Sequence, residues 1–370
     1  MKKHSLFFLL TAFIIIQFSC KKEKELSNKN CNDILDGWKI TSVEYPDVQN
    51  QNDIFFPTNE IGYSVGNTGT IMKTSNGGSN WEILEQYYSS GSGINQNALT
   101  KARLLTVHFI DKMDGFAGGE GEISHINNTR TGAVFLSTVN GGDSWKKKYL
   151  DDVEKINDLV FFDQENGLGL FTIKNENNSR QIKLVSTNDG GENWEEVDFP
   201  FINIQSSNFI LTPSYVMILA IDRYNSTNLI SSNNNGIDWE FKSTPPVVCN
   251  RAYFIDDEVG YMMCGQLTYQ TKDSGGSWAK TESPMNISSF IHFKNTEEGF
   301  VINSIYELIS GGGESRPVLK SFEVFQTIDG GMNWEKTEID KECNFIGINH
   351  SPSKNIVYSI GTTINKFEVE

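Results

Sequence analysis

Thr187-Asn188-Asp189-Gly190-Gly191-Glu192-Asn193-Trp194 is the clearest of six copies of one motif, Ser/Thr-x-Asp/Asn-x-Gly-x-x-Trp. Six of the seven tryptophans end a copy, and successive tryptophans lie 39 to 64 residues apart. Self-similarity at such a period is typical of propellers and solenoids, whose units bury their cores against their neighbours. The Asp/Asn and Trp positions of the six copies are Asn76 and Trp81, Asn140 and Trp145, Asp189 and Trp194, Asn234 and Trp239, Asp273 and Trp278, and Asp329 and Trp334.

The chemistry of the motif is that of a hairpin turn. An Asp or Asn side chain accepts hydrogen bonds from backbone N–H groups two residues further on, and Gly supplies the positive φ that tight turns need. The tryptophan packs its ring between neighbouring hairpins, and its N–H reaches a local carbonyl. We therefore expect structural roles for all twelve of these residues.

The repeat around Trp194 contains four short strands. Apolar or alternating segments cover Asp158–Phe162, Leu168–Ile173, Ile182–Ser186 and Trp194–Val197, with turn-forming residues between them. Four antiparallel strands per repeat predict one blade of a propeller.

The motif resembles the Asp-box (BNR) repeat of sialidase-type propellers. The wider frame Gly62–Thr74 is most similar to the photosystem II stability/assembly factor-like propeller family, and related frames recur at Gly115–Gly119 and Gly260–Gly265. The resemblance covers nearly the whole chain after its leader. It implies a propeller fold and a habit of binding partners, and it implies little about activity, because Asp boxes are turn devices.

Six motif-bearing blades leave three strands at the C-terminus, Phe345–Ile348, Ile356–Ile360 and Ile364–Val369. The segment Gly37–Val43 is a lone strand near the start of the chain. Placing it on the last sheet closes a ring and removes exposed sheet edges. We predict an all-β, seven-bladed β-propeller of four-stranded antiparallel blades over residues 32–370, with the N-terminal strand completing the last blade.

The first residues have the pattern of a targeting signal. Lys2 and Lys3 precede the apolar stretch Leu6–Phe18, which is followed by Ser19 and Cys20. We interpret residues 1–19 as a lipoprotein signal peptide and residues 20–31 as a lipidated Cys20 with a flexible tether. An ordinary secretory peptide is the alternative. We expect a lipid anchor in the outer membrane of a bacterial cell envelope, on its periplasmic or outer side.

The formal net charge is −16, and the six arginines are dispersed. This balance repels phosphate backbones, so we expect no nucleic-acid partner. Cys249 and Cys264 flank a hairpin turn and could form a disulfide, and Cys31 and Cys343 could meet where the ring closes. Four unpaired cysteines remain the alternative.

Binding is expected on the face that carries the loops between second and third strands and the connections between blades. The chain varies in length there, as binding loops do, although tolerated insertions remain the alternative. The candidate residues on this face are Tyr87, Tyr88, His125, Arg130, Arg180, Tyr306 and Arg316.

A glycoside hydrolase is the alternative function. A sialidase, by the resemblance, needs three arginines that converge on a carboxylate, a Tyr–Glu pair and an Asp acid/base, and no early Arg-Ile-Pro segment occurs. His108 and His292 occupy equivalent first strands and are expected to be hydrogen-bonded wall residues, so we expect no metal and no cofactor. The preferred prediction is a monomeric, non-catalytic scaffold that binds a protein or glycan.

Overall fold

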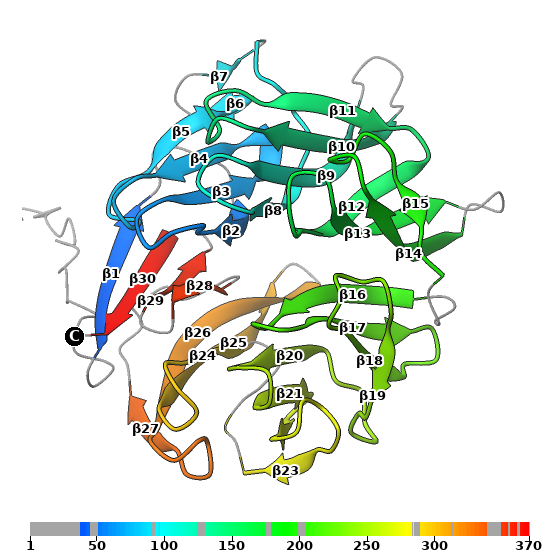
Figure 1. Cartoon of the computed structure of the whole chain (residues 1–370). Helices are drawn as coiled ribbons and strands as arrows, with labels where there is room; N and C mark the ends of the chain where they lie inside the picture. The colour runs from blue at the N-terminus through cyan, green and yellow to red at the C-terminus, as the bar shows by residue number, and fades with distance from the viewer. Residues whose placement is uncertain are drawn as a thin grey trace, which may run out of the picture. The chain divides into compact units, whose positions relative to one another are not determined.

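The fold is an all-β propeller in which antiparallel sheets stand around a common centre (Figure 1). The only helix among the described residues is a short 3-10 turn, η2 (Asn67–Gly69). Within that part of the chain, no helix has the length and hydrophobicity needed to cross a membrane. The computed structural model describes residues 38–44, 51–89, 93–95, 97–123, 130–174, 179–198, 204–282, 284, 289–311, 314–338, 349–353, 356–360 and 363–369.

Four of the sheets are meanders in which four consecutive strands are neighbours. The first contains β2 (Gln51–Phe55), β3 (Gly62–Gly66), β4 (Ile71–Thr74) and β5 (Glu82–Glu85). The second contains β16 (Ile204–Leu211), β17 (Val216–Asp222), β18 (Thr227–Ser232) and β19 (Glu240–Lys242). The third contains β20 (Arg251–Phe254), β21 (Gly260–Cys264), β22 (Leu267–Thr271) and β23 (Ala279–Thr281). The fourth contains β24 (Ser289–Phe293), β25 (Gly299–Gly311), β26 (Glu314–Thr327) and β27 (Glu335–Glu338).

An eight-stranded sheet lies between the first and second of these along the chain. It consists of two meanders that are joined by a single pairing, Lys155 with Glu120. The strands of the first half are β8 (Leu104–Phe109), β9 (Gly115–Ile123), β10 (Arg130–Thr138) and β11 (Lys146–Leu150). The strands of the second half are β12 (Val153–Phe161), β13 (Gly167–Lys174), β14 (Arg180–Thr187) and β15 (Glu195–Glu196). A two-stranded ribbon, β6 (Tyr88–Ser89) and β7 (Gly93–Ile94), precedes it.

The last sheet joins the start of the described chain to its end. The strand order is β1 (Trp38–Glu44), β30 (Thr363–Val369), β29 (Ile356–Ile360) and β28 (Asn349–Ser353). The register runs from Trp38 opposite Val369 to Glu44 opposite Thr363. The N-terminal strand therefore lies outermost on the C-terminal sheet. This position was predicted, because the segment has no partner strands close to it in the sequence. The predicted strand Phe345–Ile348 lies outside the described residues.

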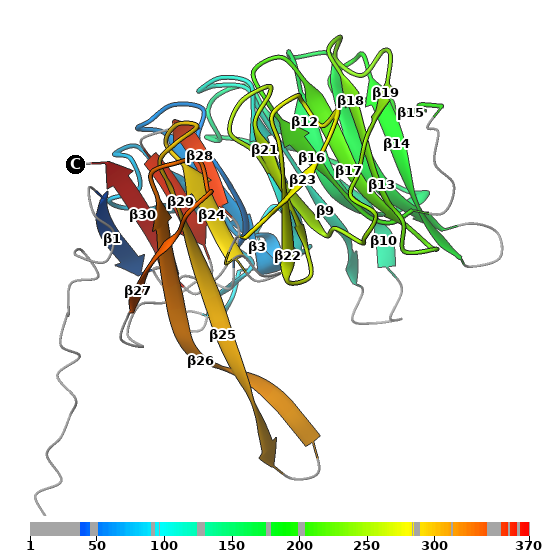
Figure 2. The same cartoon turned by 90° about the horizontal axis from the view of Figure 1, so that it is seen from below.

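One hairpin is much longer than the rest. β25 and β26 pair from Gly299–Thr327 to Gly311–Glu314, whereas β24 and β27 pair only with the end nearest the ring. The outer part of this hairpin projects well beyond the other strands (Figure 2).

Aromatic rings repeat at the contacts between neighbouring sheets. The ring of Phe56 stacks on Tyr358 at 4.0 Å and meets the edge of Trp81 at 5.8 Å. Tyr63, Phe109 and Trp145 repeat the arrangement, at 3.7 and 6.0 Å. The motif tryptophan thus covers a phenylalanine of its own blade, which in turn stacks on the preceding blade. Such burial is the main stabilising contribution available to small stacked units.

A glycine at the start of the second strand makes room for that phenylalanine. A Cβ on Gly115 would lie 2.3 Å from the Phe109 ring, and one on Gly62 would lie 2.4 Å from Phe56. Only glycine permits the ring to lie flat against the strand, which explains the Gly-aromatic frames in the sequence.

The hydrogen bonds of the motif differ from the expected turn. Thr187 Oγ1 accepts from the Gly191 N–H at 2.9 Å and donates to Asp189 Oδ1 at 2.9 Å. Asp189 Oδ1 accepts from the Asn193 N–H at 2.8 Å. The acceptor therefore reaches four residues on rather than two, because the Thr hydroxyl holds the carboxylate over the whole loop.

The tryptophan N–H groups divide into two sets. Those of Trp239 and Trp334 donate to the carbonyl of the glycine three residues earlier, and that of Trp278 donates to Ser243. The N–H groups of Trp81 and Trp145, like that of Trp194, are buried without an acceptor among the described residues. The expected local bond therefore forms at Trp239 and Trp334, whereas the acceptor of Trp278 lies 35 residues away in sequence.

Candidate functional site

A cavity of about 730 Å³ lies at the centre of the propeller. The first strands of six meanders line it, β2, β8, β12, β16, β20 and β24. First strands are inner sheet edges, so their outward N–H groups have no strand partner and need other acceptors.

Asp53 on β2 is such an acceptor and connects β2 to β8. Its Oδ2 accepts from the Val107 N–H in β8 at 2.8 Å, and its Oδ1 accepts from the Ile54 N–H at 2.9 Å. Burial raises the pKa of Asp53 to about 8, and the charge of Asp158 adds to the rise, against the lowering effect of the N–H groups.

Asp158 repeats the arrangement two blades on. Its Oδ2 accepts from the Phe209 N–H in β16 at 2.9 Å, and its Oδ1 accepts from the Leu159 N–H and from the Thr106 hydroxyl. Burial raises the pKa of Asp158 to about 6. Together the two carboxylates connect the inner strands β2, β8, β12 and β16.

The two histidines of the wall are hydrogen-bonded. His108 Nε2 lies 3.1 Å from the Phe161 carbonyl, and burial lowers the pKa of His108 to about 4. His292 Nδ1 lies 3.4 Å from the Tyr253 hydroxyl, which also accepts from the Phe293 N–H at 3.2 Å. No cluster of three or more His, Cys, Asp or Glu that could hold a metal occurs among the described residues.

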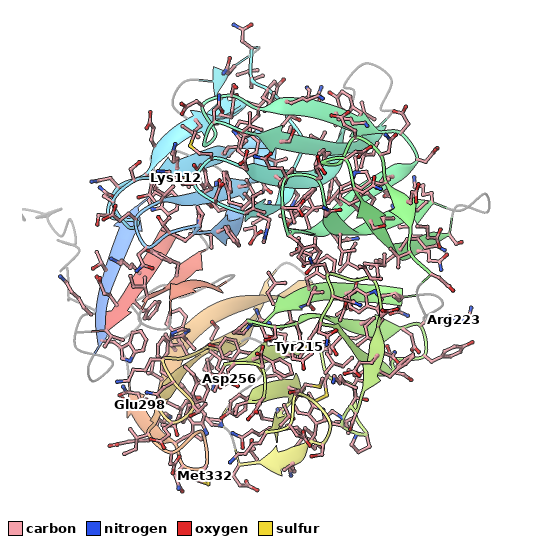
Figure 3. The ribbon with its side chains drawn as sticks, in the orientation of Figure 1. Lys112, Tyr215, Arg223, Asp256, Glu298 and Met332 are labelled. Atoms are coloured by element: carbon pink, nitrogen blue, oxygen red, sulfur yellow. A yellow bond between two sulfur atoms is a disulfide. The ribbon has the colours of Figure 1, made fainter. Side chains whose placement is uncertain are left out.

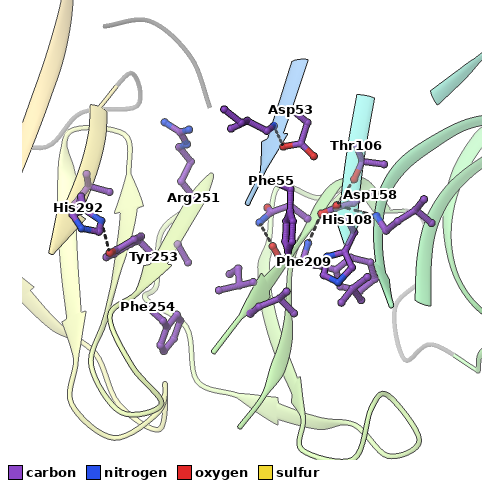
Figure 4. Close-up of a pocket in the computed structure, with 18 of the residues that line it drawn as sticks. Asp53, Phe55, Thr106, His108, Asp158, Phe209, Arg251, Tyr253, Phe254 and His292 are labelled. Carbon is purple, nitrogen blue, oxygen red and sulfur yellow. Dashed lines mark hydrogen bonds between the residues drawn. The ribbon is translucent and has the colours of Figure 1, made fainter. Parts of the chain in front are cut away.

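Arg251 extends from β20 into the cavity, across from Asp53 and Asp158 (Figure 4). Burial lowers the pKa of its guanidinium. No sequence pattern marks Arg251, because the residues that share the cavity with it come from strands far away in the chain.

A second recess, of about 690 Å³, lies where β12, β14 and β16 begin and β9 ends. Ile182 and Ile204 are buried in its floor. Arg180 on its rim forms a two-pronged ion pair with Glu154, with N–O distances of 2.7 and 2.8 Å. Ends of second strands and beginnings of third strands share one face of an antiparallel blade. The recess is therefore on the face where binding was expected.

Arg223 also lines this recess and was not among the predicted residues. It lies in the loop between β17 and β18, at the outer edge of the propeller (Figure 3). Its guanidinium lies 4.7 Å from the Tyr224 ring centroid and donates to the Tyr224 hydroxyl at 2.5 Å. Tyr224 is 71% exposed, and its backbone N–H is held by Asp222. The short loop gave no length signal in the sequence.

The other predicted face residues are spread over several blades. Tyr87 is half-buried, and its backbone bonds to Thr68 and Asn95. The backbones of Tyr88 and Arg130 lie in β6 and at the start of β10, and those of Tyr306 and Arg316 lie in the long hairpin. His125 lies outside the described residues. Among the predicted face residues whose side chains the structure describes, Arg180 lines this recess and Tyr87 does not.

Cys249 and Cys264 form a disulfide, and both are buried. They are one position out of direct register, since Met263 pairs with Arg251 and its carbonyl accepts from the Asn250 N–H. Cys20, Cys31 and Cys343 lie outside the described residues.

Comparison with known proteins supports the fold class, an all-β propeller. A solved structure described as "YCF48 bound to D1 peptide" is similar with a TM-score of 0.63 at 16% identity, over 91% of this chain and 96% of that chain. YCF48 from Cyanidioschyzon merolae is similar with a TM-score of 0.59 at 14% identity, over 90% and 99%. At these identities the likeness shows the fold alone.

Glycoside hydrolases share the fold as well. The GH74 xyloglucanase from Xanthomonas campestris is similar with a TM-score of 0.56 at 13% identity, over 88% of this chain and 52% of that chain. This chain thus spans about half the length of that enzyme. No protein-family model and no curated protein matches this chain.

Proposed function

We propose that this chain is a non-catalytic scaffold that binds a protein partner through the recess around Arg180 and Arg223. The observation that carries the proposal is the make-up of the recess. Ile182 and Ile204 give an apolar floor, and ionised side chains of both signs surround it. An apolar centre within a polar rim is the pattern of protein interfaces.

Two further observations favour a protein over a glycan. Tyr224 and Arg223 form an exposed aromatic–guanidinium pair beside the recess, and these two residue types dominate interface hot spots. The similar YCF48 structure was solved with a peptide, which shows that a propeller of this arrangement accommodates one. A monomer with one such face is sufficient for this role.

The proposal includes seven blades. The eight-stranded sheet counts as two, since Lys155–Glu120 is its only connecting pair among the described residues. The six motifs then act as Asp boxes, one at the outer hairpin of each of six blades. The last blade takes its outer strand from β1 instead.

The proposal also includes a lipid anchor at Cys20 and a place in a bacterial envelope, at the outer membrane. It rests on the sequence of residues 1–20 alone. Expression of the full chain with a labelled fatty acid should label the wild type and leave Cys20→Ser unlabelled and unprocessed. Equal labelling of both would overturn the anchor without touching the recess.

The binding function is tested by affinity capture from an envelope extract with Arg180→Ala and Arg223→Ala variants. A partner retained by the wild type should be lost or weakened about tenfold by either change. Lys272→Ala, an exposed change on the motif face, should retain it. A partner that binds all three equally would exclude the recess.

A glycoside hydrolase has one observation in its favour. Asp53 and Asp158 face the central cavity with raised pKa values, as a general acid does, and GH74 enzymes share the fold. Their backbone hydrogen bonds favour a structural role. Hydrolysis of a polysaccharide by the wild type, abolished by Asp158→Asn in a folded protein, would establish the enzyme instead.

A further inference from the structure

The walls of the central cavity differ in charge. The two carboxylates, Asp53 and Asp158, lie on the side of β2 and β12, while Arg251 stands on the opposite wall on β20 (Figure 4). The Arg251 guanidinium is charged, whereas the raised pKa of Asp53 leaves much of that carboxyl protonated at neutral pH. An anionic group is therefore favoured near β20.

The backbone of β20 adds a donor at the same wall. Val107 and Phe209 offer outward N–H groups, which Asp53 and Asp158 occupy. Ala252 is the equivalent residue of β20, two positions before the phenylalanine that lies against the glycine of the next strand. Among the described residues, no side chain accepts from its N–H. The residue in the place of the carboxylates is Asn208, whose amide instead donates to the Phe209 carbonyl at 3.3 Å.

The rest of the lining suits an organic molecule. Phe55, Ile210 and Phe254 supply apolar surface beside the polar groups. A volume of about 730 Å³ lies within the range of pockets for small organic ligands. Inorganic anions would leave this apolar surface unused.

We propose that the central cavity binds a small organic carboxylate, whose charged group lies between the Arg251 guanidinium and the Ala252 N–H. The apolar part of the ligand then faces Phe55 and Phe254. The site is separate from the recess at Arg180, so it does not depend on the partner-binding function.

Isothermal titration calorimetry of the purified chain tests the proposal with benzoate, succinate and citrate. At least one should bind saturably, and benzamide, which lacks the charge of benzoate, should bind at least about tenfold more weakly than benzoate. Inorganic phosphate should bind more weakly than the best carboxylate. No saturable binding up to millimolar concentrations, or tighter binding of phosphate, would overturn the proposal.

Substitutions of Arg251 test whether the carboxylate binds at this wall of the cavity. Arg251→Gln should weaken the best carboxylate at least about tenfold, and Arg251→Lys, which keeps the charge without the planar fork, should weaken it less. Lys272→Gln, at an exposed position outside the cavity, should leave the affinity unchanged. Circular dichroism and thermal melts establish that each variant is folded, and if Arg251→Gln fails to fold, the Lys variant carries the test. Unchanged affinity in a folded Arg251 variant would exclude this wall as the site.

Discussion

A single hydroxyl organises each motif loop. Thr187 is buried, and its hydroxyl accepts from the N–H of Gly191 and donates to Asp189, so one side chain both satisfies a buried amide and orients the carboxylate. The same bonds recur around Thr74, Ser232 and the other first residues of the motif. All six copies in this chain thus begin with a hydroxyl residue, whereas both Asp and Asn occur two residues later.

Thr187→Val should therefore destabilise the protein by about 1–3 kcal/mol, because it keeps the shape and leaves buried N–H groups without an acceptor. Chemical unfolding followed by fluorescence measures the change. Asp189→Asn is the matched control and should be nearly silent, since Asn140 makes the same bonds elsewhere in the chain. Equal effects of the two changes would contradict this account of the motif.

Trp81→Ala should cost about 3–5 kcal/mol, since the indole is buried against Phe56, which stacks on Tyr358 of the closing sheet. The thermal midpoint and the denaturant midpoint should both fall. Trp278, which is less buried and bonded to Ser243, should tolerate the same change better. A larger loss at Trp278 would show that its hydrogen bond outweighs ring burial.

At the scale of the strand, the inner edges of the propeller depend on side chains from neighbouring blades. Asp53 and Asp158 accept backbone N–H groups across blade boundaries, and Tyr253 does so for Phe293. Each such bond replaces the strand partner that an inner edge lacks. The free energy of unfolding should therefore change with pH as these carboxylates titrate.

The pH dependence follows from the sign of each shift. The pKa of Asp53 rises from 3.8 to about 8 on folding, so its stabilising contribution is complete below pH 4 and is lost as the pH rises through 8. The pKa of His108 falls from 6.5 to about 4, so its contribution is lost as the pH drops from 6.5 to 4. Asp158, with a pKa of about 6, acts in the same direction as Asp53 at lower pH.

Between pH 6.5 and 8 the effect of Asp53 dominates. The free energy of unfolding should fall with rising pH there, by up to about 1.4 kcal/mol per pH unit. Asp53→Asn should flatten that slope even if it lowers stability throughout. Urea unfolding at a series of pH values gives the slope for the wild type and for Asp53→Asn. Equal slopes for the two proteins would show that Asp53 does not titrate between pH 6.5 and 8.

The strands and turns could be predicted from local pattern, whereas the cavity could not. Alternating apolar residues and Gly-containing turns located the blade around Trp194 to within a few residues. The partners of Asp53 and Arg251 come from other blades, and no spacing in the chain encodes such meetings. The sequence predicted only part of the recess at Arg180. The length of the loop before Arg180 indicated the correct face, whereas the loop that carries Arg223 is too short to stand out.

At the scale of the whole molecule, the stability of the ring depends on the closing sheet, which contains β1, β30, β29 and β28. Trp38 is 5% exposed and packs at 5.1 Å against Phe300 and at 5.5 Å against His292. A strand from near the start of the chain therefore anchors the last sheet to the one before it. This pairing could be predicted from the sequence, because three C-terminal strands need a fourth to complete a four-stranded sheet.

Trp38→Ala should lower the free energy of unfolding by about 3–5 kcal/mol and open the ring at this sheet first. Hydrogen exchange should then show faster exchange in β30 and β29 than in β13. Lys39→Ala, at an exposed neighbouring position, is the control. Uniformly faster exchange across all blades would mean that the ring opens as one unit.

The pairing of Trp38 with Val369 brings residues far apart in sequence to the same end of adjacent strands. A short linker could splice these two points, and new ends could be cut at the tight turn between β12 and β13, giving a circular permutant with every strand neighbour retained. In such a rearranged gene product the pairing of β1 with β30 would become a contact between neighbours in sequence.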